Sequence, residues 1–223
     1  MIRRASLAAA VVLAVLASLV LLSPAWADKE GDSIKLFNGK NLDGWKTFLA
    51  DKAAKAEDTW KIEDGVIICK GKPNGYIITD KEYGDYILKL KWRWAPGSKG
   101  GNSGVFLHVS GEDKIWPKGI EAQLFANNAG DFWLVGGYKL DVDPARKMGD
   151  RRFVRLKTDK PVEKDIGEWN EYVITCKGDT VKLEINGQLV NEGKGAESSK
   201  RKILLQSEGA EVHFKDITLM PIK

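Results

Sequence analysis

Residues 86–94 read Tyr86-Ile87-Leu88-Lys89-Leu90-Lys91-Trp92-Arg93-Trp94, and this stretch decides the fold class. Successive side chains of a β-strand point to opposite faces of its sheet, so alternating apolar and polar residues are typical of a half-buried strand. One face would carry the apolar side chains of Tyr86, Leu88, Leu90, Trp92 and Trp94. We therefore expect the two tryptophans to pack in a core, with Arg93 on the opposite, polar face.

The same two-residue period recurs along most of the chain after residue 27. Further runs lie at residues 59–63, 65–69, 76–79, 105–109, 120–125, 132–135, 169–176, 181–185, 203–206 and 212–220. Turn sequences separate them, such as the Asn186-Gly187 pair, which favours the positive φ of a tight hairpin. Residues 51–58 could form one short helix. Many short strands without a long helix predict an all-β fold, an antiparallel sandwich.

The first 27 residues have the three-part layout of a secretory signal peptide. A basic start is followed by an apolar run over residues 7–22, and Ala25-Trp26-Ala27 offers a signal peptidase site. The apolar run is shorter than the ~20 residues that span a bilayer, although a retained anchor is the alternative. The sequence predicts a signal peptide at residues 1–27 and a single domain at residues 28–223. The product would be periplasmic or secreted, with no membrane contact after cleavage.

The charge pattern argues against binding to nucleic acid. Lys and Arg number 35 against 31 Asp and Glu, which gives a net charge of +4. Proteins that bind nucleic acid gather their basic residues on one face or segment. Here the signs are intermixed, and even the basic stretch at residues 146–155 is interrupted by Asp150.

The chain has two cysteines, Cys69 and Cys176, each at the end of an apolar run. In an oxidising compartment they could form a disulfide. Two separately buried thiols fit equally well, because Cys packs as a small apolar side chain. Two cysteines without clustered histidines do not indicate zinc.

A carboxylate and a carboxamide share one face of the strand expected around residues 119–125. Glu121 and Gln123 alternate there with apolar residues and lie on the same face as Phe125. This combination suits the recognition of sugar hydroxyls, and Glu121 could act as a general acid or base. The alternative is an ordinary solvent-facing sheet surface, which antiparallel sheets often have.

Two more side chains are candidates for the same site. His108 would lie on the face of Phe106 and would titrate near neutral pH. The guanidinium of Arg93 could bind a carboxylate or a negatively charged intermediate. The alternatives are a packed histidine and a solvated strand face, which Arg93 would share with Lys89 and Lys91.

Three tryptophans near expected turns, Trp116, Trp133 and Trp169, could stack on the C–H face of a sugar, although buried packing is the alternative for each. The familiar catalytic signatures are missing: a nucleophile elbow, a phosphate-binding glycine loop and a helical His-Glu-x-x-His.

Residues 141–151 and 157–168 lack the strand period. Loops of this length are functional or mobile, and we expect these to be mostly mobile and solvated.

Several segments of the chain are similar to one family, the 3-keto-disaccharide hydrolase domain family. They run in order from about Ile34 to the C-terminus. The most specific are the Leu36-Phe37-Asn38-Gly39-Lys40 opening and Glu168-Trp169-Asn170. The others are residues 41–45, Asn102-Ser103-Gly104-Val105, Glu121-Ala122-Gln123, Ile185-Asn186-Gly187, Leu205-Gln206 and Phe214-Lys215-Asp216-Ile217.

The resemblance implies a concanavalin A-like lectin/glucanase fold. This is a jelly roll of two curved antiparallel sheets with a carbohydrate cleft on the concave sheet. It agrees with the sandwich predicted from the strand pattern. In related glucanases the cleft strand carries several carboxylates, whereas here Gln123 stands where a second acid would follow Glu121. The carboxylate pair of standard glycoside hydrolysis is therefore missing from this motif.

The resemblance also implies an activity on 3-keto-glycosides and 3-keto-disaccharides. A ketone at C3 acidifies the proton at C2, so the bond at C1 can break by elimination, and hydration then gives net hydrolysis. Glu121 or His108 would be the base, with Glu121 ranked first and Arg93 stabilising the charge. Substrate contacts would come from Asn102, Ser103, Gln123, Trp133 and Gln206. No metal site is assigned, although a divalent metal could replace Arg93 as the electrophile.

The chain departs from the family pattern at three places around the presumed cleft. Lys91 replaces a frequent acid, His108 replaces a frequent Arg, and Ser207-Glu208-Gly209 replaces a frequent His-Gly pair. The chemistry would also require a separate sugar 3-oxidoreductase to make the substrate, since no cofactor motif for that oxidation occurs in the chain.

Two other functions remain open from the sequence. A non-catalytic carbohydrate-binding module would use the same face and would show a flat row of exposed tryptophans, with Glu121 buried in a salt bridge. A structural or cell-envelope interaction domain would need an apolar stripe on a polar face, and the sequence shows no clear one. Polar and titratable residues converging on one sheet would favour the enzyme.

Overall fold

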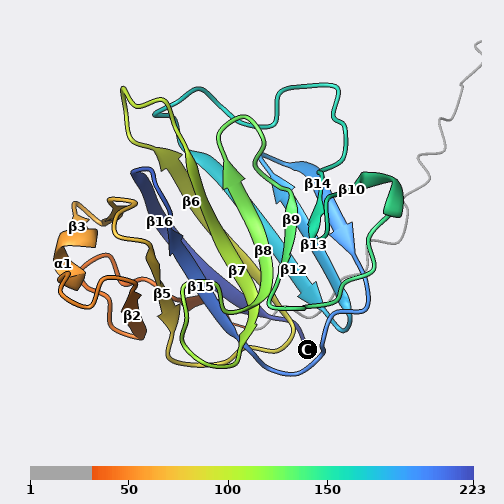
Figure 1. Cartoon of the computed structure of the whole chain (residues 1–223), viewed down its shortest axis with the longest axis horizontal. Coiled ribbons are helices and arrows are strands. Elements are labelled where there is room, and N and C mark those ends of the chain that lie inside the picture. Colours follow the sequence, from red (N-terminus) through yellow and green to blue (C-terminus); the bar gives the residue numbers. More distant parts are fainter. Residues whose placement is uncertain (1–31) are drawn as a thin grey trace, which may run out of the picture.

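A computed structural model describes residues 32–223, which form two antiparallel β-sheets stacked as a sandwich (Figure 1). The predicted signal peptide at residues 1–27 lies outside the described residues. The short helix α1 (Ala56–Thr59) and the 3-10 turn η1 (Pro144–Arg146) interrupt the strands. Within residues 32–223, no helix is long and apolar enough to cross a membrane. The all-β prediction is confirmed.

The first sheet has the strand order β14-β13-β12-β6-β16-β4-β3, and β1 pairs with β16 at its side. Its strands are β1 (Ile34–Lys35), β3 (Trp60–Glu63), β4 (Val66–Cys69), β6 (Tyr86–Trp94), β12 (Asn170–Lys177), β13 (Thr180–Ile185), β14 (Gln188–Gly193) and β16 (Val212–Pro221). The predicted turn joins β13 to β14, with φ of +50° at Asn186 and +77° at Gly187. These positive angles are those that a tight hairpin turn requires.

The second sheet has the strand order β10-β11-β9-β8-β7-β15-β5-β2. Its strands are β2 (Trp45–Leu49), β5 (Gly75–Thr79), β7 (Asn102–Ser110), β8 (Lys118–Phe125), β9 (Phe132–Val135), β10 (Lys147–Met148), β11 (Arg152–Phe153) and β15 (Lys202–Ser207). Strands β7, β8 and β9 form the middle of this sheet and lie at the front in Figure 1. They position the candidate site.

The main core lies between the two sheets. Strand β6 contributes the face predicted from its alternation, and Leu88 and Trp92 are fully buried there. From the second sheet, Ile120, Ala122 and Leu124 meet this core. The alternation of polar and apolar residues therefore predicted correctly which side chains of both strands point inward.

A second apolar cluster covers the other face of the second sheet, away from the first sheet. It contains Tyr76, Ile78, Phe106, Val109, Val135 and Leu204, with Phe48, Trp116 and Trp133 packed against it. A sheet with apolar clusters on both faces must be covered on its outer face as well. Here the loop that carries Trp116 contributes to that cover, and Asp113 in the same loop accepts a 2.9 Å hydrogen bond from the Tyr76 hydroxyl.

The two cysteines are free and buried. Cys69 lies on β4 and Cys176 on β12, and β6 and β16 run between these strands. Three strand spacings put them roughly 14 Å apart, beyond the ~7 Å between Cα atoms that a disulfide can bridge. Burial raises the pKa of both thiols to about 12.

Candidate functional site

Strand β8 separates the core from the candidate site. Its odd-numbered residues Glu121 and Gln123 point away from the first sheet, and each is only 6% exposed. The solvent-facing alternative for this face is therefore wrong. Phe125, expected to flank them, is at the strand end and 44% exposed.

The two side chains line a pocket with a volume of about 180 Å³. Its lining residues come from β7, β8, β9 and three connecting segments: Asn102, Trp116, Glu121, Gln123, Trp133, Val135, Arg151 and Glu208. The structure thus brings together four residues predicted for the site, namely Asn102, Glu121, Gln123 and Trp133. A larger cavity of about 260 Å³ near Tyr76 and Arg201 contains none of the predicted site residues.

Gly104 makes room for the carboxyl group of Glu121. In the β7–β8 ladder Gly104 lies opposite Gln123. A Cβ atom at position 104 would lie 2.7 Å from Oε1 and 2.8 Å from Cγ of Glu121. The glycine of the Asn-Ser-Gly segment is therefore needed for space, because any larger side chain would displace the carboxyl group.

The carboxyl group of Glu121 is buried and incompletely bonded. Its Oε1 atom has no hydrogen-bond partner among the described residues. Burial raises its pKa well above the usual value, the nearby Glu208 raises it further, and Arg151 opposes the rise. Buried polar atoms without partners are rare in folded proteins, so this oxygen atom is placed to meet a ligand or water.

Glu208, in the turn between β15 and β16, supplies a second carboxyl group. Burial raises its pKa, while the amide of Asn102 and the charge of Arg151 lower it. Two neighbouring carboxyl groups share protons, because ionisation of one disfavours ionisation of the other. Such a pair can provide a base and an acid in one pocket. In the sequence, Glu208 belongs to a segment that departs from the family pattern, but the sequence pattern did not predict this role.

A hydrogen-bond chain fixes the amide of Gln123. The indole nitrogen of Trp133 donates to Gln123 Oε1 at 2.7 Å, and Gln123 Nε2 donates to Asn102 Oδ1 at 3.2 Å. Gln206, beside Glu208, is 1% exposed and has no partner for either amide atom among residues 32–223. Gln206, predicted for the site, is not among the residues that line the pocket. The bonded amides of Gln123 and Asn102 give the pocket fixed hydrogen-bonding atoms, as a sugar-binding site requires.

Arg151 is the positively charged residue that lines the pocket. Its guanidinium carbon lies 5.4 Å from the centre of the Trp133 ring, and that of Arg152 lies 5.7 Å from it. We expected residues 141–151 to be mostly mobile and solvated. Arg151 is exposed, as a solvated segment requires, and it also lines the pocket. The positive charge near Glu121 comes from this loop.

The structure places Arg93, predicted as the positive group of the site, in the first sheet. Its Nε atom donates to His213 Nδ1 at 3.2 Å, and its guanidinium stacks 4.5 Å from the ring centre of Trp169. The expectation that Arg93 lies beside Glu121 is therefore wrong. The cause is that β6 and β8 belong to different sheets, and the outer faces of these sheets point in opposite directions.

His108 also lies apart from the pocket. A β-bulge lies between Leu107 and Ser110, and His108 has a φ of +52°, so the alternation breaks after Leu107. The imidazole lies 6.0 Å from the Tyr138 ring, and burial lowers its pKa. Its expected place on the face of Phe106 is therefore corrected.

Ser103 is a second correction on β7. It is fully buried, it lies opposite Leu124, and its hydroxyl donates to the backbone oxygen of Gln206 at 2.8 Å. The alternation of β7 turns this side chain toward the core, away from the pocket. Ser103 therefore joins β7 to β15 and does not line the substrate site.

The described part of the chain contains no set of side chains that could bind a metal ion. No group of three or more His, Cys, Asp and Glu side chains there could hold a metal ion. The pocket itself offers two carboxyl groups, Glu121 and Glu208, and the guanidinium of Arg151 as its positive group.

Solved structures with the same fold are carbohydrate-active or carbohydrate-binding proteins. A proposed glycosyl hydrolase from Parabacteroides distasonis has a TM-score of 0.61 and 27% identity, and the match covers 86% of this chain and 94% of the other. A Bacillus licheniformis β-glucanase has a TM-score of 0.58 and 11% identity, and the match covers 86% of this chain and 99% of the other. The Bacillus subtilis carbohydrate-binding module CBM66 has a TM-score of 0.52 and 15% identity, and the match covers 79% of this chain and 94% of the other. Both share the architecture. They confirm the jelly roll. No curated protein sequence matches the chain.

The fold is a jelly roll of the kind found in glycosyl hydrolases and carbohydrate-binding modules. The chain belongs to the family of the 3-keto-alpha-glucoside-1,2-lyase-like domain, whose model matches residues 32–220. The resemblance stated from the sequence is thereby confirmed over nearly all of the described residues.

Proposed function

We propose that this protein cleaves 3-keto-glycosides and 3-keto-disaccharides, with the pocket of Glu121 as its active site. The observation that carries the proposal is the arrangement around this carboxyl group. Its Oε1 atom is buried and unpartnered, and Arg151 and Glu208 line the same pocket. An unpaired acid, a second acid and a guanidinium are the groups that an elimination next to a ketone requires. Membership of the lyase-like family supports the same chemistry.

The first step breaks the C2–H bond of the keto sugar. The ionised carboxylate of Glu121 takes the proton, and the electron pair passes to the C3 oxygen as an enolate. A raised pKa makes this carboxylate a stronger base than an ordinary Glu. The guanidinium of Arg151, which lines the pocket from its exposed rim, stabilises the negative charge that develops on the oxygen.

The second step breaks the bond between C1 and the leaving oxygen. The enolate pair forms the C1=C2 double bond while Glu208 delivers a proton to the leaving group. Water then adds across this double bond, with its hydroxyl at C1 and its proton at C2, and the products are those of hydrolysis. Trp116, Trp133 and the amide of Gln123 would orient the sugar ring. This route needs no second carboxylate on β8, which agrees with Gln123 at that position.

The biological setting is part of the proposal. Residues 1–27 would direct the chain to export, so the enzyme would act in the periplasm or outside the cell. A separate sugar 3-oxidoreductase would supply the ketone, because the elimination requires an acidic C2 proton.

The test is turnover of 3-keto-glucosides and 3-keto-disaccharides, followed by mass spectrometry. The purified protein is compared with Glu121→Gln and with Glu171→Gln, an exposed residue of the first sheet that serves as the matched control. We expect Glu121→Gln to lose about 10³-fold in kcat, the usual contribution of a general base. Glu171→Gln should match the parent, and a chelator should change neither.

Three outcomes would count against parts of the proposal. Turnover that persists in Glu121→Gln would remove Glu121 as the base and retain the enzyme. Turnover lost on chelation would replace Arg151 with a metal as the electrophile. Binding of sugars without cleavage of any 3-keto substrate would favour a carbohydrate-binding module.

A further inference from the structure

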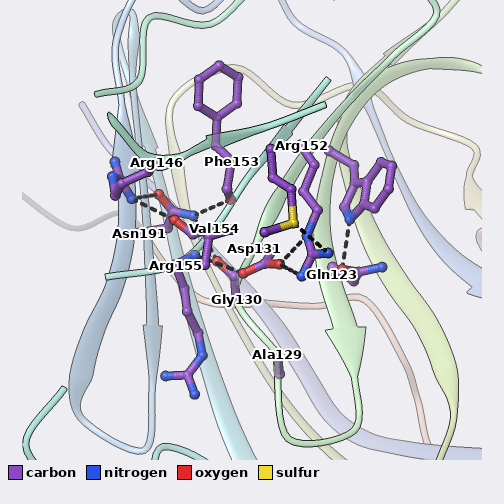
Figure 2. A network of polar contacts seen from close by, with 12 residues as sticks. Gln123, Ala129, Gly130, Asp131, Arg146, Arg152, Phe153, Val154, Arg155 and Asn191 are labelled. Atoms are coloured by element: carbon purple, nitrogen blue, oxygen red, sulfur yellow. Dashed lines mark hydrogen bonds and ion pairs between the residues drawn. The ribbon is translucent and has the colours of Figure 1, made fainter. Parts of the chain in front are cut away.

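A buried carboxylate outside the pocket holds the segment that delivers Arg151. Asp131 precedes β9, and its side chain is 1% exposed. Its Oδ2 atom accepts hydrogen bonds from Arg152, at 2.7 Å from Nε and 2.6 Å from Nη2. Its Oδ1 atom accepts the backbone N–H of Arg155 at 2.8 Å. One carboxylate therefore binds this segment at two points, the Arg152 guanidinium and the Arg155 backbone N–H, as Figure 2 shows.

Arg151 immediately precedes Arg152, the first residue that Asp131 binds. Its backbone oxygen accepts the N–H of Leu134 at 2.8 Å, and the next residue, Arg152, lies opposite Trp133 in the β9–β11 ladder. Strand β11 is only two residues long, so its backbone ladder is a weak constraint by itself. The ion pair of Asp131 with Arg152 supplies a constraint next to Arg151 that the short strand lacks.

A second polar anchor holds the start of the same segment. Arg146 donates to the Asn191 side chain at 2.6 Å and to the backbone oxygen of Val154 at 3.3 Å (Figure 2). Residues 147–151 connect this anchor to the ion pair between Arg152 and Asp131. All five residues between the anchors are exposed, Arg151 included, whereas Phe153, just beyond Arg152, is 8% exposed and packs in the core. The position of Arg151 therefore depends on its backbone bond to Leu134 and on the polar contacts of Arg146 and Arg152.

We propose that Asp131 is a positioning residue of the active site. It does not line the pocket, and it acts by fixing the backbone that places Arg151 beside Trp133 and in the same pocket as the two carboxyl groups. A charge-assisted pair of this kind is short and directional, so it sets geometry as well as energy. The inference deepens the proposed function, on which it rests for the role of Arg151.

The first test is a double-mutant cycle with Asp131→Asn, Arg151→Gln and the combined variant. If Asp131 acts through Arg151, Asp131→Asn should lower kcat about tenfold in the parent and less than about twofold when Arg151 is already replaced. Equal losses in both backgrounds would mean a general structural role and would overturn the proposal. Arg152→Gln, which keeps the bond from Arg155 to Asp131, should reproduce part of the effect if Asp131→Asn does not fold.

The second test needs no substrate, so it separates this inference from the proposed function. NMR of a carbon-13-labelled Glu121 carboxyl group gives its pKa in the parent and in each variant. Glu208 raises this pKa and Arg151 lowers it. Displacement of Arg151 should therefore move the pKa of Glu121 upward in both Asp131→Asn and Arg151→Gln.

The direction of the NMR shift is diagnostic. Loss of the negative charge of Asp131 would by itself lower the pKa of a nearby carboxyl group. An unchanged or lowered pKa of Glu121 in Asp131→Asn would therefore contradict the positioning role, even in a protein that cleaves no 3-keto sugar.

Discussion

Strands β6 and β8 share the same alternating pattern, yet their polar faces meet opposite environments. On β6, Lys89 is exposed, and Arg93 is half-buried against Trp169 on the outer face of the first sheet. On β8, Glu121 and Gln123 are 6% exposed on the outer face of the second sheet. The inward faces of both strands are equally well buried. The difference lies in what covers the outward faces.

The cover on β8 comes from segments distant in sequence. The loop of Trp116, the segment of Arg151 and the turn of Glu208 converge on the outer face of the second sheet and close the pocket. Alternation along a strand determines which residues share a face. It contains no information on whether that face meets water or a loop, and this is why Arg93 and Glu121 were both predicted for one site.

The largest contrast should come from the two arginines. Arg151→Gln removes the positive group of the pocket and should lower kcat/KM about 10²-fold, the usual effect of losing one electrostatic stabiliser of a transition state. Arg93→Gln, on the other sheet, should leave kcat/KM within about twofold. It should lower the free energy of unfolding by only the ~0.5–1 kcal/mol that stacking on Trp169 provides. Steady-state kinetics and denaturant melts measure both. A reversed order of effects would place the active site on the first sheet.

A smaller effect should follow from a single added methyl group on β7. Gly104→Ala would place a carbon atom 2.7 Å from Glu121 Oε1 and should push the carboxyl group out of position. We expect about a tenfold loss of kcat, since small displacements of a catalytic group are costly, and a loss of roughly 1–3 kcal/mol in stability from overpacking.

Gly84→Ala is the matched control, because the new carbon atom would meet only the Lys200 side chain at 3.5 Å. It should retain full activity. If Gly104→Ala were equally active, the close fit of Glu121 against β7 would have no role in catalysis.

The third contrast concerns stability and pH. The pKa of Glu121 is raised in the folded protein above its ordinary value of 4.5, so the folded state retains a proton that the unfolded chain releases. The free energy of unfolding therefore falls as pH rises from the ordinary pKa toward the folded one. Glu121→Gln lacks this penalty, so its stability advantage over the parent should grow between pH 4.5 and pH 8.

Denaturant melts at the two pH values test this third prediction, with the exposed Glu171→Gln as the control for loss of a carboxylate. An advantage that shrinks as pH rises would show that the carboxylate of Glu121 is stabilised in the fold. Its pKa would then be lowered, and its strength as a base would be lost.

Much of the fold could be predicted from the sequence, because most strands have one clearly apolar face. The run at residues 132–135 matches β9, and residues 212–220 match β16 to within one residue. Five strands were missed: the two-residue strands β1, β10 and β11, which are too short to show a period, and the longer β2 and β14. In β2 the exposed Lys46 and Thr47 are adjacent, and in β14 the buried Val190 and Asn191 are adjacent, so neither strand shows the two-residue period.

The site was predictable only in part. Glu121, Gln123, Asn102 and Trp133 could be found because they lie on strands with a readable period or in a family motif. His108 was misplaced because a β-bulge, which no nearby residue indicates, reverses the alternation after Leu107.

Arg151 and Glu208 enter the pocket from connecting segments, whose paths depend on contacts distant in sequence. For Arg151, these contacts include the ion pair between Asp131 and Arg152. No spacing rule relates Asp131 to residues 151–155, so the positive charge of the pocket could not be derived from the sequence pattern.

The most direct test of the proposed chemistry is cleavage of a 3-keto-glucoside in D₂O, with early analysis of the released sugar by NMR and mass spectrometry. Elimination followed by hydration removes the C2 proton and replaces it from solvent, so the product should carry deuterium at C2. Product incubated with Glu121→Gln corrects for exchange of this acidic position without turnover. Cleavage that leaves hydrogen at C2 would show direct hydrolysis, and it would contradict the role of Glu121 as the base that starts an elimination.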